Sequence, residues 1–240
     1  MLSENAFTKE NLDTYLRELG KEYRRLNGKN MPAEIILIGG AAIIANYGFR
    51  DMTTDVDAII HAMSSMKDAI NRVGDKHNLP NAWLNADFVK TGSYSPKLDE
   101  FSVHYKVFSN VLHVRTVAAE YLVAMKLCAG RKYKNDLSDV IGILAEHQKR
   151  GSPISFDAVS TAVINLYGSW DSISQDSRAF IADLMKCDDL QALYKQTRAD
   201  EIASKELITS FDKDYPGVAN TDNAENILKT LKAKLNAENK

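Results

Sequence analysis

Asp55 and Asp57, separated only by Val56, are the residues whose types and spacing most directly suggest chemistry in this sequence. The apolar residues 58–60 follow, which predicts that the pair lies at the start of a buried strand. Because alternate side chains of a strand share one face, both carboxylates would lie side by side, with Cα atoms about 7 Å apart. Neighbouring carboxylates repel each other, and a divalent cation relieves that repulsion. Hard oxygen ligands suit Mg²⁺ or Mn²⁺, so the pair predicts a metal site.

A glycine pair upstream complements these acids. Gly39 and Gly40 follow the β-branched run 34–38, which predicts a buried strand that ends in a tight turn. Glycines after a strand let backbone N–H groups approach an anion closely, and the N-terminus of the following helix favours phosphate. Arg50 and the pair Thr53-Thr54 precede the acids and can add hydrogen bonds to a phosphate. Together these residues predict a site for a metal-bound nucleotide.

The elements that must position these residues follow from hydrophobic periodicity and from glycine and proline positions. We predict an α/β (α+β) fold, in which a small mixed sheet is flanked by helices and followed by a helical C-terminal region. Valines and tyrosine alternate with polar residues over 103–107, and Ser109-Asn110 is a two-residue turn into a second strand, so this stretch predicts a β-hairpin. The expected helices are 7–27, 41–47, 64–77, 156–167, 174–186 and 223–236, and the expected strands are 34–38, 55–60, 103–107 and 111–116.

The loop signal Gly151-Ser152-Pro153 predicts the boundary between two domains. Residues 1–150 would form the α/β domain that carries the aspartate pair. Residues 151–240 would form the helical C-terminal region, which follows helices that begin at Ala118.

Composition limits the class of protein. The formal net charge is -2, so the chain lacks the strong positive charge typical of direct nucleic-acid binding. The two cysteines predict neither a disulfide framework nor a zinc cluster. The N-terminus is polar, and no apolar run approaches the roughly 20 residues that span a bilayer. We therefore expect a soluble, cytoplasmic protein without a membrane partner.

Two segments carry a resemblance to a known family. Residues 38–42, Ile-Gly-Gly-Ala-Ala, precede Arg50, Thr53, Thr54 and the aspartate pair, and a second segment runs over 120–140. In this order they resemble the minimal nucleotidyltransferases of the DNA polymerase β superfamily, and within it the AbiEii-like and MenT-like bacterial toxin group. The segment Trp83-Leu84-Asn85 is also similar, and the resemblance covers roughly residues 34–145.

This resemblance implies an activity and further site residues. It implies transfer of a nucleoside monophosphate from an NTP to an acceptor such as a tRNA or a protein, with Mg²⁺ held by the aspartate pair. It implies a toxin role and an antitoxin partner. Lys126 would contact the triphosphate with Arg131 nearby, and Asp139, or else Asp136, would have a role in the site. The alternatives are that Lys126 is a snorkelling lysine, and that the two aspartates are a solvated helix flank or charges at a helix N-terminus.

The chain departs from the family pattern at two points, and other functions stay open. Gly39-Gly40 stands where many superfamily members have Gly-Ser, and the strand 111–116 offers His113 and Arg115 where a third metal-binding acid often lies. A helix aspartate could substitute for that acid. One alternative is a non-catalytic nucleotide-binding or protein-interaction module on the same fold. Another is a glycosyltransferase, in which D-x-D also binds a metal-nucleotide, although only 54 residues precede Asp55.

Overall fold

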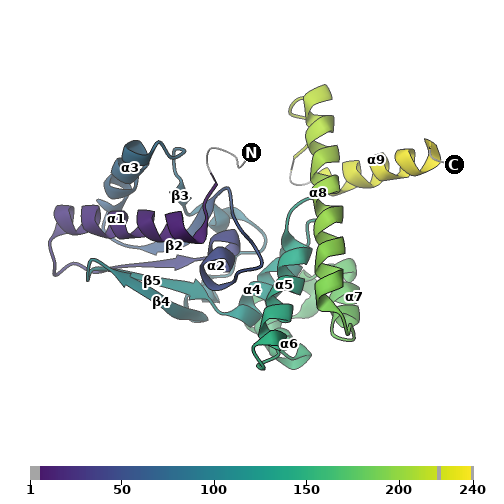
Figure 1. Ribbon diagram of the computed structural model, residues 1–240, viewed down its shortest axis with the longest axis horizontal. Helices are drawn as coiled ribbons and strands as arrows, with labels where there is room; N and C mark the ends of the chain where they lie inside the picture. Colours follow the sequence, from purple (N-terminus) through teal and green to yellow (C-terminus); the bar gives the residue numbers. More distant parts are fainter. Residues whose placement is uncertain (1–5, 221–222, 239–240) are drawn as a thin grey trace. The chain divides into compact units, whose positions relative to one another are not determined.

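The chain forms two compact units in the computed structural model, which describes residues 6–220 and 223–238 (Figure 1). The first unit comprises Met1–Met125 and Asp157–Ser172, and the second comprises Lys126–Phe156 and Ile173–Lys240. The units are interleaved in sequence and do not correspond to a single cut at residue 151. The domain division predicted there stays a prediction.

A five-stranded mixed sheet forms the centre of the first unit, in the order β3-β2-β1-β5-β4. The central strand β1 pairs antiparallel with β2 and parallel with β5, β2 pairs parallel with β3, and β5 pairs antiparallel with β4. The strands are β1 (Ala33–Leu37), β2 (Val56–His61), β3 (Leu84–Asn85), β4 (Ser102–Phe108) and β5 (Leu112–Val117). This mixed α/β architecture confirms the predicted fold class.

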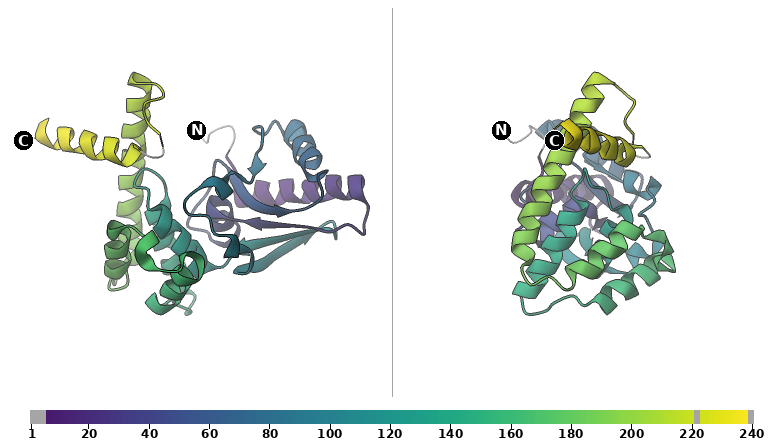
Figure 2. Two further views of the ribbon diagram at one scale, coloured as in Figure 1. Left: turned by 180° about the vertical axis from the view of Figure 1, so that it is seen from behind. Right: turned by 90° about the vertical axis from the view of Figure 1, so that its right-hand side faces the viewer.

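Two helices of the first unit, α1 (Lys9–Asn27) and α3 (Met66–His77), lie over the apolar face of this sheet (Figures 1 and 2). The buried residues of β1 and β2 on that face include Ile35, Leu37, Val56 and Ala58. The helices of this unit are α1 (Lys9–Asn27), α2 (Gly39–Asn46), α3 (Met66–His77) and α6 (Phe156–Tyr167), with the short 3-10 turns η1 (Asp87–Lys90), η2 (Pro96–Asp99) and η3 (Trp170–Ser172).

Local sequence signals account for several of these elements. The side chain of Thr8 accepts a hydrogen bond from the Asn11 N–H at 3.4 Å, and Asn11 caps the Thr8 N–H in return, so α1 begins with a reciprocal cap. The hairpin of β4 and β5 turns at Ser109 and Asn110, which both have positive φ as mirror-image hairpin turns require. The predicted hairpin is confirmed, and the helix predicted over 7–27 is present but begins two residues later, because Phe7 forms a β-bridge and Thr8 is the cap.

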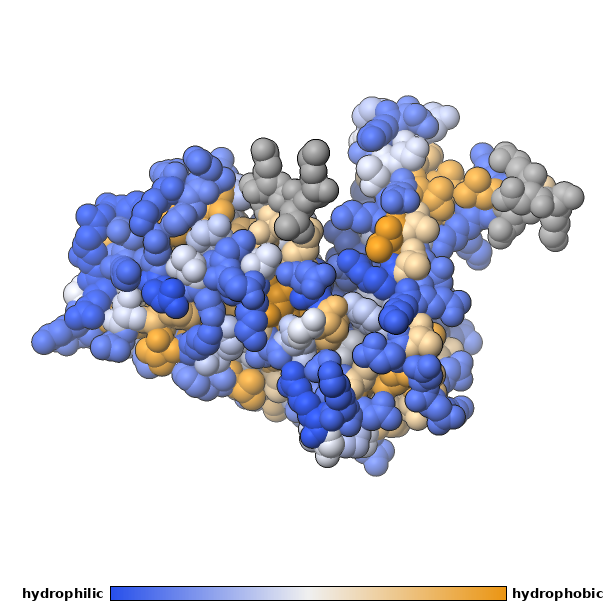
Figure 3. Space-filling model, viewed as in Figure 1, coloured by the Kyte–Doolittle hydropathy of each residue, from blue (hydrophilic) through white to orange (hydrophobic). Residues whose placement is uncertain are grey.

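The second unit is helical. Its longest helix, α8 (Leu190–Asp214), runs along α5 (Asp136–Lys149) (Figures 1 and 2). The sequence predicts that this region is helical but does not predict the bounds of α8. The elements of this unit are α5 (Asp136–Lys149), α7 (Gln175–Leu184), α8 (Leu190–Asp214) and α9 (Ala224–Glu238), and α4 (Ala119–Ala129) crosses from the first unit into the second. None of the helices in the described ranges is long and apolar enough to cross a membrane. In each unit the face seen in Figure 3 is mainly hydrophilic.

Candidate active site

The Asp57 carboxylate lies on the more exposed face of the sheet, beside the junction of β1 and α2. Its neighbours Val56 and Ala58 are fully buried on the opposite face, as strand alternation predicts. The Asp57 carbonyl accepts a hydrogen bond from the Ile38 N–H at 3.1 Å, which fixes β2 against the end of β1. A Cβ atom built on Gly39 would lie 3.9 Å from Asp57 Oδ2. The glycine bend and this carboxylate are therefore neighbours.

The helix α2 begins at Gly39, two residues earlier than predicted, so the glycine pair forms its first turn. Gly39 has a φ of +53°, which is costly for any residue with a side chain. No side chain caps this turn. Because the first N–H groups of a helix have no partner within it, the turn directs backbone donors outward beside the acids.

Asp55 immediately precedes β2 instead of beginning it, which corrects the predicted strand 55–60. Its exposed carboxylate accepts a hydrogen bond from the Thr53 hydroxyl, with 3.2 Å between Thr53 Oγ1 and Asp55 Oδ1. The Arg50 guanidinium donates to Thr53 Oγ1 at 3.3 Å and to the Met52 carbonyl at 2.9 Å. Thr54 is exposed next to this chain of contacts.

The structure thus brings together most of the predicted residues of the first unit. Gly39, Gly40 and Asp57 meet at the β1–α2 junction, and Gly40 contacts both Thr53 and Arg50. Among the described residues, no group of three or more histidines, cysteines and carboxylates is arranged to hold a metal. At the position of the third acid, His113 is exposed and Arg115 forms an ion pair with Glu34 at 3.5 Å.

Replacing Gly40 by alanine is expected to destabilise the protein by about 1–3 kcal/mol, because a small-to-large change in a packed position forces its neighbours apart. The new Cβ would lie 2.4 Å from Thr53 Oγ1 and 3.0 Å from Thr53 Cβ. Denaturant unfolding measures the loss. The matched change Gly48→Ala adds its Cβ where no atom lies within 4 Å, and should alter stability by less than about 0.5 kcal/mol. Equal effects of both changes would show that Gly40 is not tightly packed.

The remaining predicted residues form a buried ionic cluster in the second unit. The Lys126 ammonium lies 2.9 Å from Asp136 Oδ1 and 2.8 Å from Asp139 Oδ2. Arg131 Nε lies 2.7 Å from Asp136 Oδ2. Asp136 is fully buried, and Asp139 and Lys126 are 2% and 8% exposed. Burial alone would raise the pKa of Asp136, but the charges of Lys126 and Arg131 hold that pKa well below its usual range.

This cluster rules out both surface alternatives. Lys126 does not reach solvent as a snorkelling lysine, because its ammonium is held by two buried carboxylates. Asp136 and Asp139 do not lie on a solvated flank, but both are acidic residues in the first turn of α5, as the other alternative predicts. In the first turn of α5 the charged Asp136 and Asp139 are buried, whereas the apolar Leu137 is only half-buried.

Glu201 of α8 is a buried acid that the sequence does not reveal, because its partners lie about 60 positions away. Its Oε1 accepts hydrogen bonds from the N–H groups of Leu137 at 2.9 Å and Ser138 at 3.2 Å, and the Ser138 hydroxyl donates to Oε2. The carboxylate therefore caps the N-terminus of α5 from another helix. Burial, reinforced by the charge of Asp139, raises the pKa of Glu201 to about 7.

We expect Glu201 to make the free energy of unfolding fall as pH rises from about 4.5 to about 7. Its folded pKa exceeds the ordinary value of 4.5, so over this range the folded state holds a proton that the unfolded state has released. Glu201→Gln should remove this component of the pH dependence, which chemical denaturation at several pH values measures. Glu206→Gln, an exposed change on the same helix, should leave the wild-type slope intact. A wild-type slope in Glu201→Gln would contradict the raised pKa.

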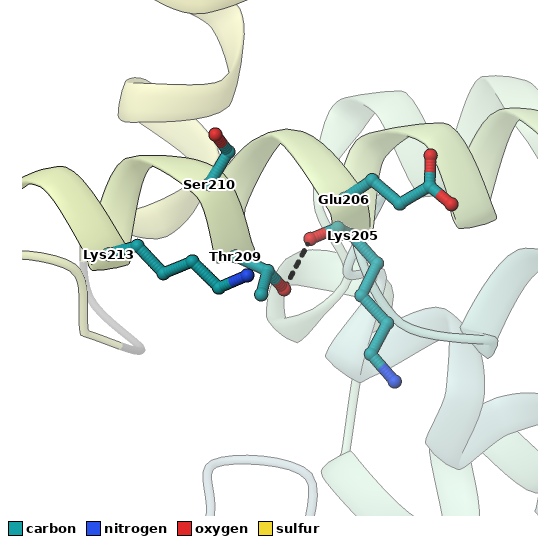
Figure 4. A pocket seen from close by; sticks show the side chains of 5 residues that line it. All are labelled: Lys205, Glu206, Thr209, Ser210 and Lys213. Atoms are coloured by element: carbon teal, nitrogen blue, oxygen red, sulfur yellow. Dashed lines mark hydrogen bonds between the residues drawn. The ribbon is translucent and has the colours of Figure 1, made fainter.

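The surface of α8 also carries a shallow depression of about 300 Å³ (Figure 4). Its lining side chains all come from this one helix and are Lys205, Glu206, Thr209, Ser210 and Lys213. The Thr209 hydroxyl donates to the Lys205 carbonyl at 2.8 Å within the helix. This is ordinary polar helix surface and contains none of the predicted site residues.

The fold and the site define a class of protein. The sheet is mixed, a short helix starts at Gly39-Gly40 between β1 and β2, and one acid lies just before β2 and one within it. This is a nucleotidyltransferase-like α/β fold. A family profile described as nucleotidyltransferase of unknown function (DUF6036) matches residues 14–148, which is more than half of the chain. The chain belongs to this family. Searches of curated proteins and of solved structures found no match.

The matched segment contains both the aspartate pair and the Lys126 cluster. The family confirms the predicted resemblance at the level of nucleotidyltransferases, for which an NTP is the substrate. Membership of the AbiEii-like and MenT-like group stays a prediction.

Proposed function

We propose that this protein is a magnesium-dependent nucleotidyltransferase that transfers a nucleoside monophosphate from an NTP to an acceptor hydroxyl. In this reaction an O–P bond forms at the α-phosphorus, the bond to the β-phosphate breaks, pyrophosphate leaves and the hydroxyl proton is released. The observation that carries the proposal is the position of the Asp57 carboxylate beside the uncapped first turn of α2. Carboxylates and outward N–H groups together suit a metal-bound triphosphate.

The residues present fit a hard divalent cation. Asp55 is exposed and, among the described residues, accepts one hydrogen bond, from Thr53, so further carboxylate lone pairs face solvent. Asp57, two residues further along the chain, is half-buried. Asp55 and Asp57 would hold Mg²⁺ or Mn²⁺. The bound cation would neutralise the negative charge that develops on the triphosphate.

The protein's own part in this reaction is positioning and electrostatics. Backbone N–H groups at Gly39 and Gly40 would bind phosphate oxygens, and Arg50 and Thr54 would lie at the same end of the sheet. The contacts of Lys126 and Arg131 with the nucleotide, and a catalytic role of Asp139, stay predictions. In the second unit these cations bind Asp136 and Asp139.

The acceptor and the biological role belong to the same proposal and depend on the sequence resemblance. The proposed acceptor is a tRNA or a protein. The proposed role is that of the toxin in a toxin–antitoxin or phage-defence pair, with an antitoxin protein as partner. Growth arrest on overexpression, relieved by Asp57→Ala, would support the toxin role. Normal growth at high levels of folded wild-type protein would contradict it.

Incubation with each α-labelled NTP, Mg²⁺ and total RNA or protein tests the proposed reaction. We expect label to move to one class of acceptor with release of an equal amount of pyrophosphate. A non-catalytic nucleotide-binding module would bind the same NTP, which calorimetry detects, but would release no pyrophosphate. Binding without pyrophosphate release in the presence of both acceptor pools would overturn the enzymatic proposal.

A further inference from the structure

Thr53 is a buried residue at the centre of the candidate site, with only 2% of its surface exposed. Its backbone forms an isolated antiparallel bridge with Phe7: the Phe7 N–H donates to the Thr53 carbonyl at 2.8 Å, and the Thr53 N–H donates to the Phe7 carbonyl at 2.9 Å. Phe7 is 1% exposed, and its ring packs against Trp83 and Tyr15 with centroids about 6 Å away. The main chain of Thr53 is therefore anchored to the core.

The hydrogen bonds of the Thr53 hydroxyl have only one consistent direction. Arg50 Nη2 lies 3.3 Å from Thr53 Oγ1, and a guanidinium can only donate. A threonine hydroxyl has a single hydrogen, and the Asp55 carboxylate 3.2 Å away can only accept. The hydroxyl thus accepts from Arg50 and donates its one proton to Asp55. It has no second proton to donate to a phosphate. In the predicted Thr53-Thr54 pair, only the Thr54 hydroxyl can therefore donate a hydrogen bond to a phosphate.

The absence of a side chain on Gly40 allows this arrangement. The position that a Cβ on Gly40 would take lies 2.4 Å from Thr53 Oγ1 and 2.9 Å from Arg50 Nη2. The first turn of α2 therefore packs directly on the Arg50–Thr53 contact. Asp57 faces the same turn through Gly39. Thr53 consequently links the exposed Asp55 carboxylate to the bend that Asp57 adjoins.

We propose that Thr53 is a positioning residue, which orients the Asp55 carboxylate for metal binding through its hydroxyl and contacts neither the metal nor the nucleotide. The inference rests on the metal site of the proposed function. A charge-assisted hydrogen bond restricts the rotation of an exposed carboxylate, and partners that orient a metal ligand in this way typically change metal affinity by about 10–100-fold.

Binding of Mn²⁺ alone, without nucleotide, tests this inference independently of turnover. In two-dimensional amide NMR spectra of the full chain, Mn²⁺ bound at Asp55 and Asp57 should broaden the signals of Gly39 and Gly40. We expect Thr53→Val to need at least about 10-fold more Mn²⁺ than wild type for equal broadening. Thr53→Ser keeps the hydroxyl and should stay within about 2-fold of wild type. The matched control Thr14→Val, at an exposed position of α1, should behave as wild type.

A double-mutant cycle separates positioning from a general loss of structure. If Thr53 acts through Asp55, adding Thr53→Val to Asp55→Asn should cost no further Mn²⁺ affinity. Chemical-shift dispersion in the same spectra reports folding, and Thr53→Ala removes the hydroxyl by a second route if the valine variant does not fold. Wild-type Mn²⁺ affinity in a folded Thr53→Val or Thr53→Ala variant would overturn the inference, as would additive losses in the cycle.

Other outcomes distinguish this inference from the proposed function. If Gly39 and Gly40 broaden in wild type and Thr53→Val weakens the effect, the positioning role stands even when no NTP and acceptor pair gives transfer. In that case only the enzymatic proposal fails. If Mn²⁺ leaves both glycine signals unchanged in wild type, the metal site is wrong and the positioning role is wrong with it.

Discussion

Replacing Asp57 by asparagine is expected to reduce nucleotidyl transfer at least about 100-fold while the protein remains folded. The side chain keeps its size, but one of the two negative charges that would hold Mg²⁺ is lost. Asp57 is only half-buried and asparagine has nearly the same shape, so the fold should tolerate the change. The measurement is the rate of pyrophosphate release at NTP and Mg²⁺ concentrations that saturate the wild-type protein, together with the thermal unfolding curve.

The matched control for this prediction is Asp75→Asn, which makes the same chemical change on the exposed surface of α3 in the same unit. It should leave both the rate and the unfolding curve at wild-type values. Equal rates for wild type and a folded Asp57→Asn variant would remove the carboxylate pair from the mechanism. A fall in rate that raising the Mg²⁺ concentration fully restores would instead indicate weakened metal binding with the catalytic arrangement intact.

Replacing Lys126 by methionine is expected to destabilise the protein by about 3–5 kcal/mol, which is the largest stability effect that we predict. Methionine fills a similar volume, so the loss would come from charge. Asp136 and Asp139 are almost completely buried, and without the ammonium both lose the ion pair with Lys126, while Asp136 keeps its ion pair with Arg131. Removing one partner of a buried ion pair leaves an uncompensated charge away from water. Urea unfolding at neutral pH measures the change.

Two variants test the reason for this loss. Lys186→Met removes an exposed lysine that lies 4.0 Å from Asp183, and should change stability by less than about 1 kcal/mol. Adding Asp136→Asn and Asp139→Asn to Lys126→Met removes the buried negative charges, and should recover a large part of the lost stability. If the triple variant is less stable than Lys126→Met alone, packing and not charge explains the role of Lys126.

Much of the fold of the first unit could be predicted because its signals are local. The β-branched run before Gly39 predicts β1, the alternation before Ser109 predicts the hairpin, and the period of the leucines predicts α1. Each pattern depends on residues within one element. The ends were less accurate: Asp55 precedes β2, and α2 takes in both glycines, because hydrogen bonding with neighbouring strands and turns decides where an element begins.

The interior of the second unit could not be predicted in the same way. A lysine in an apolar helix followed by two aspartates is compatible with a surface helix, and both surface alternatives for Lys126, Asp136 and Asp139 were wrong. Burial of these groups depends on the packing of α8 against α5. The hydrophobic periodicity of either helix alone does not predict that packing. Glu201 shows most clearly why its burial could not be predicted. Its carboxylate accepts hydrogen bonds from the backbone N–H groups of Leu137 and Ser138, which lie far away in the sequence.

The sequence by itself determined the chemical types of the candidate site: a D-x-D pair, a glycine bend before it, and an α/β arrangement that brings them near one another. The tertiary structure alone decided which groups touch, namely Thr53 with Asp55, Gly40 with Thr53 and Lys126 with two buried aspartates. The physical reason is that residue type and spacing fix the charge and face of a side chain within one element. Its burial and partners are fixed by whichever other element packs against it.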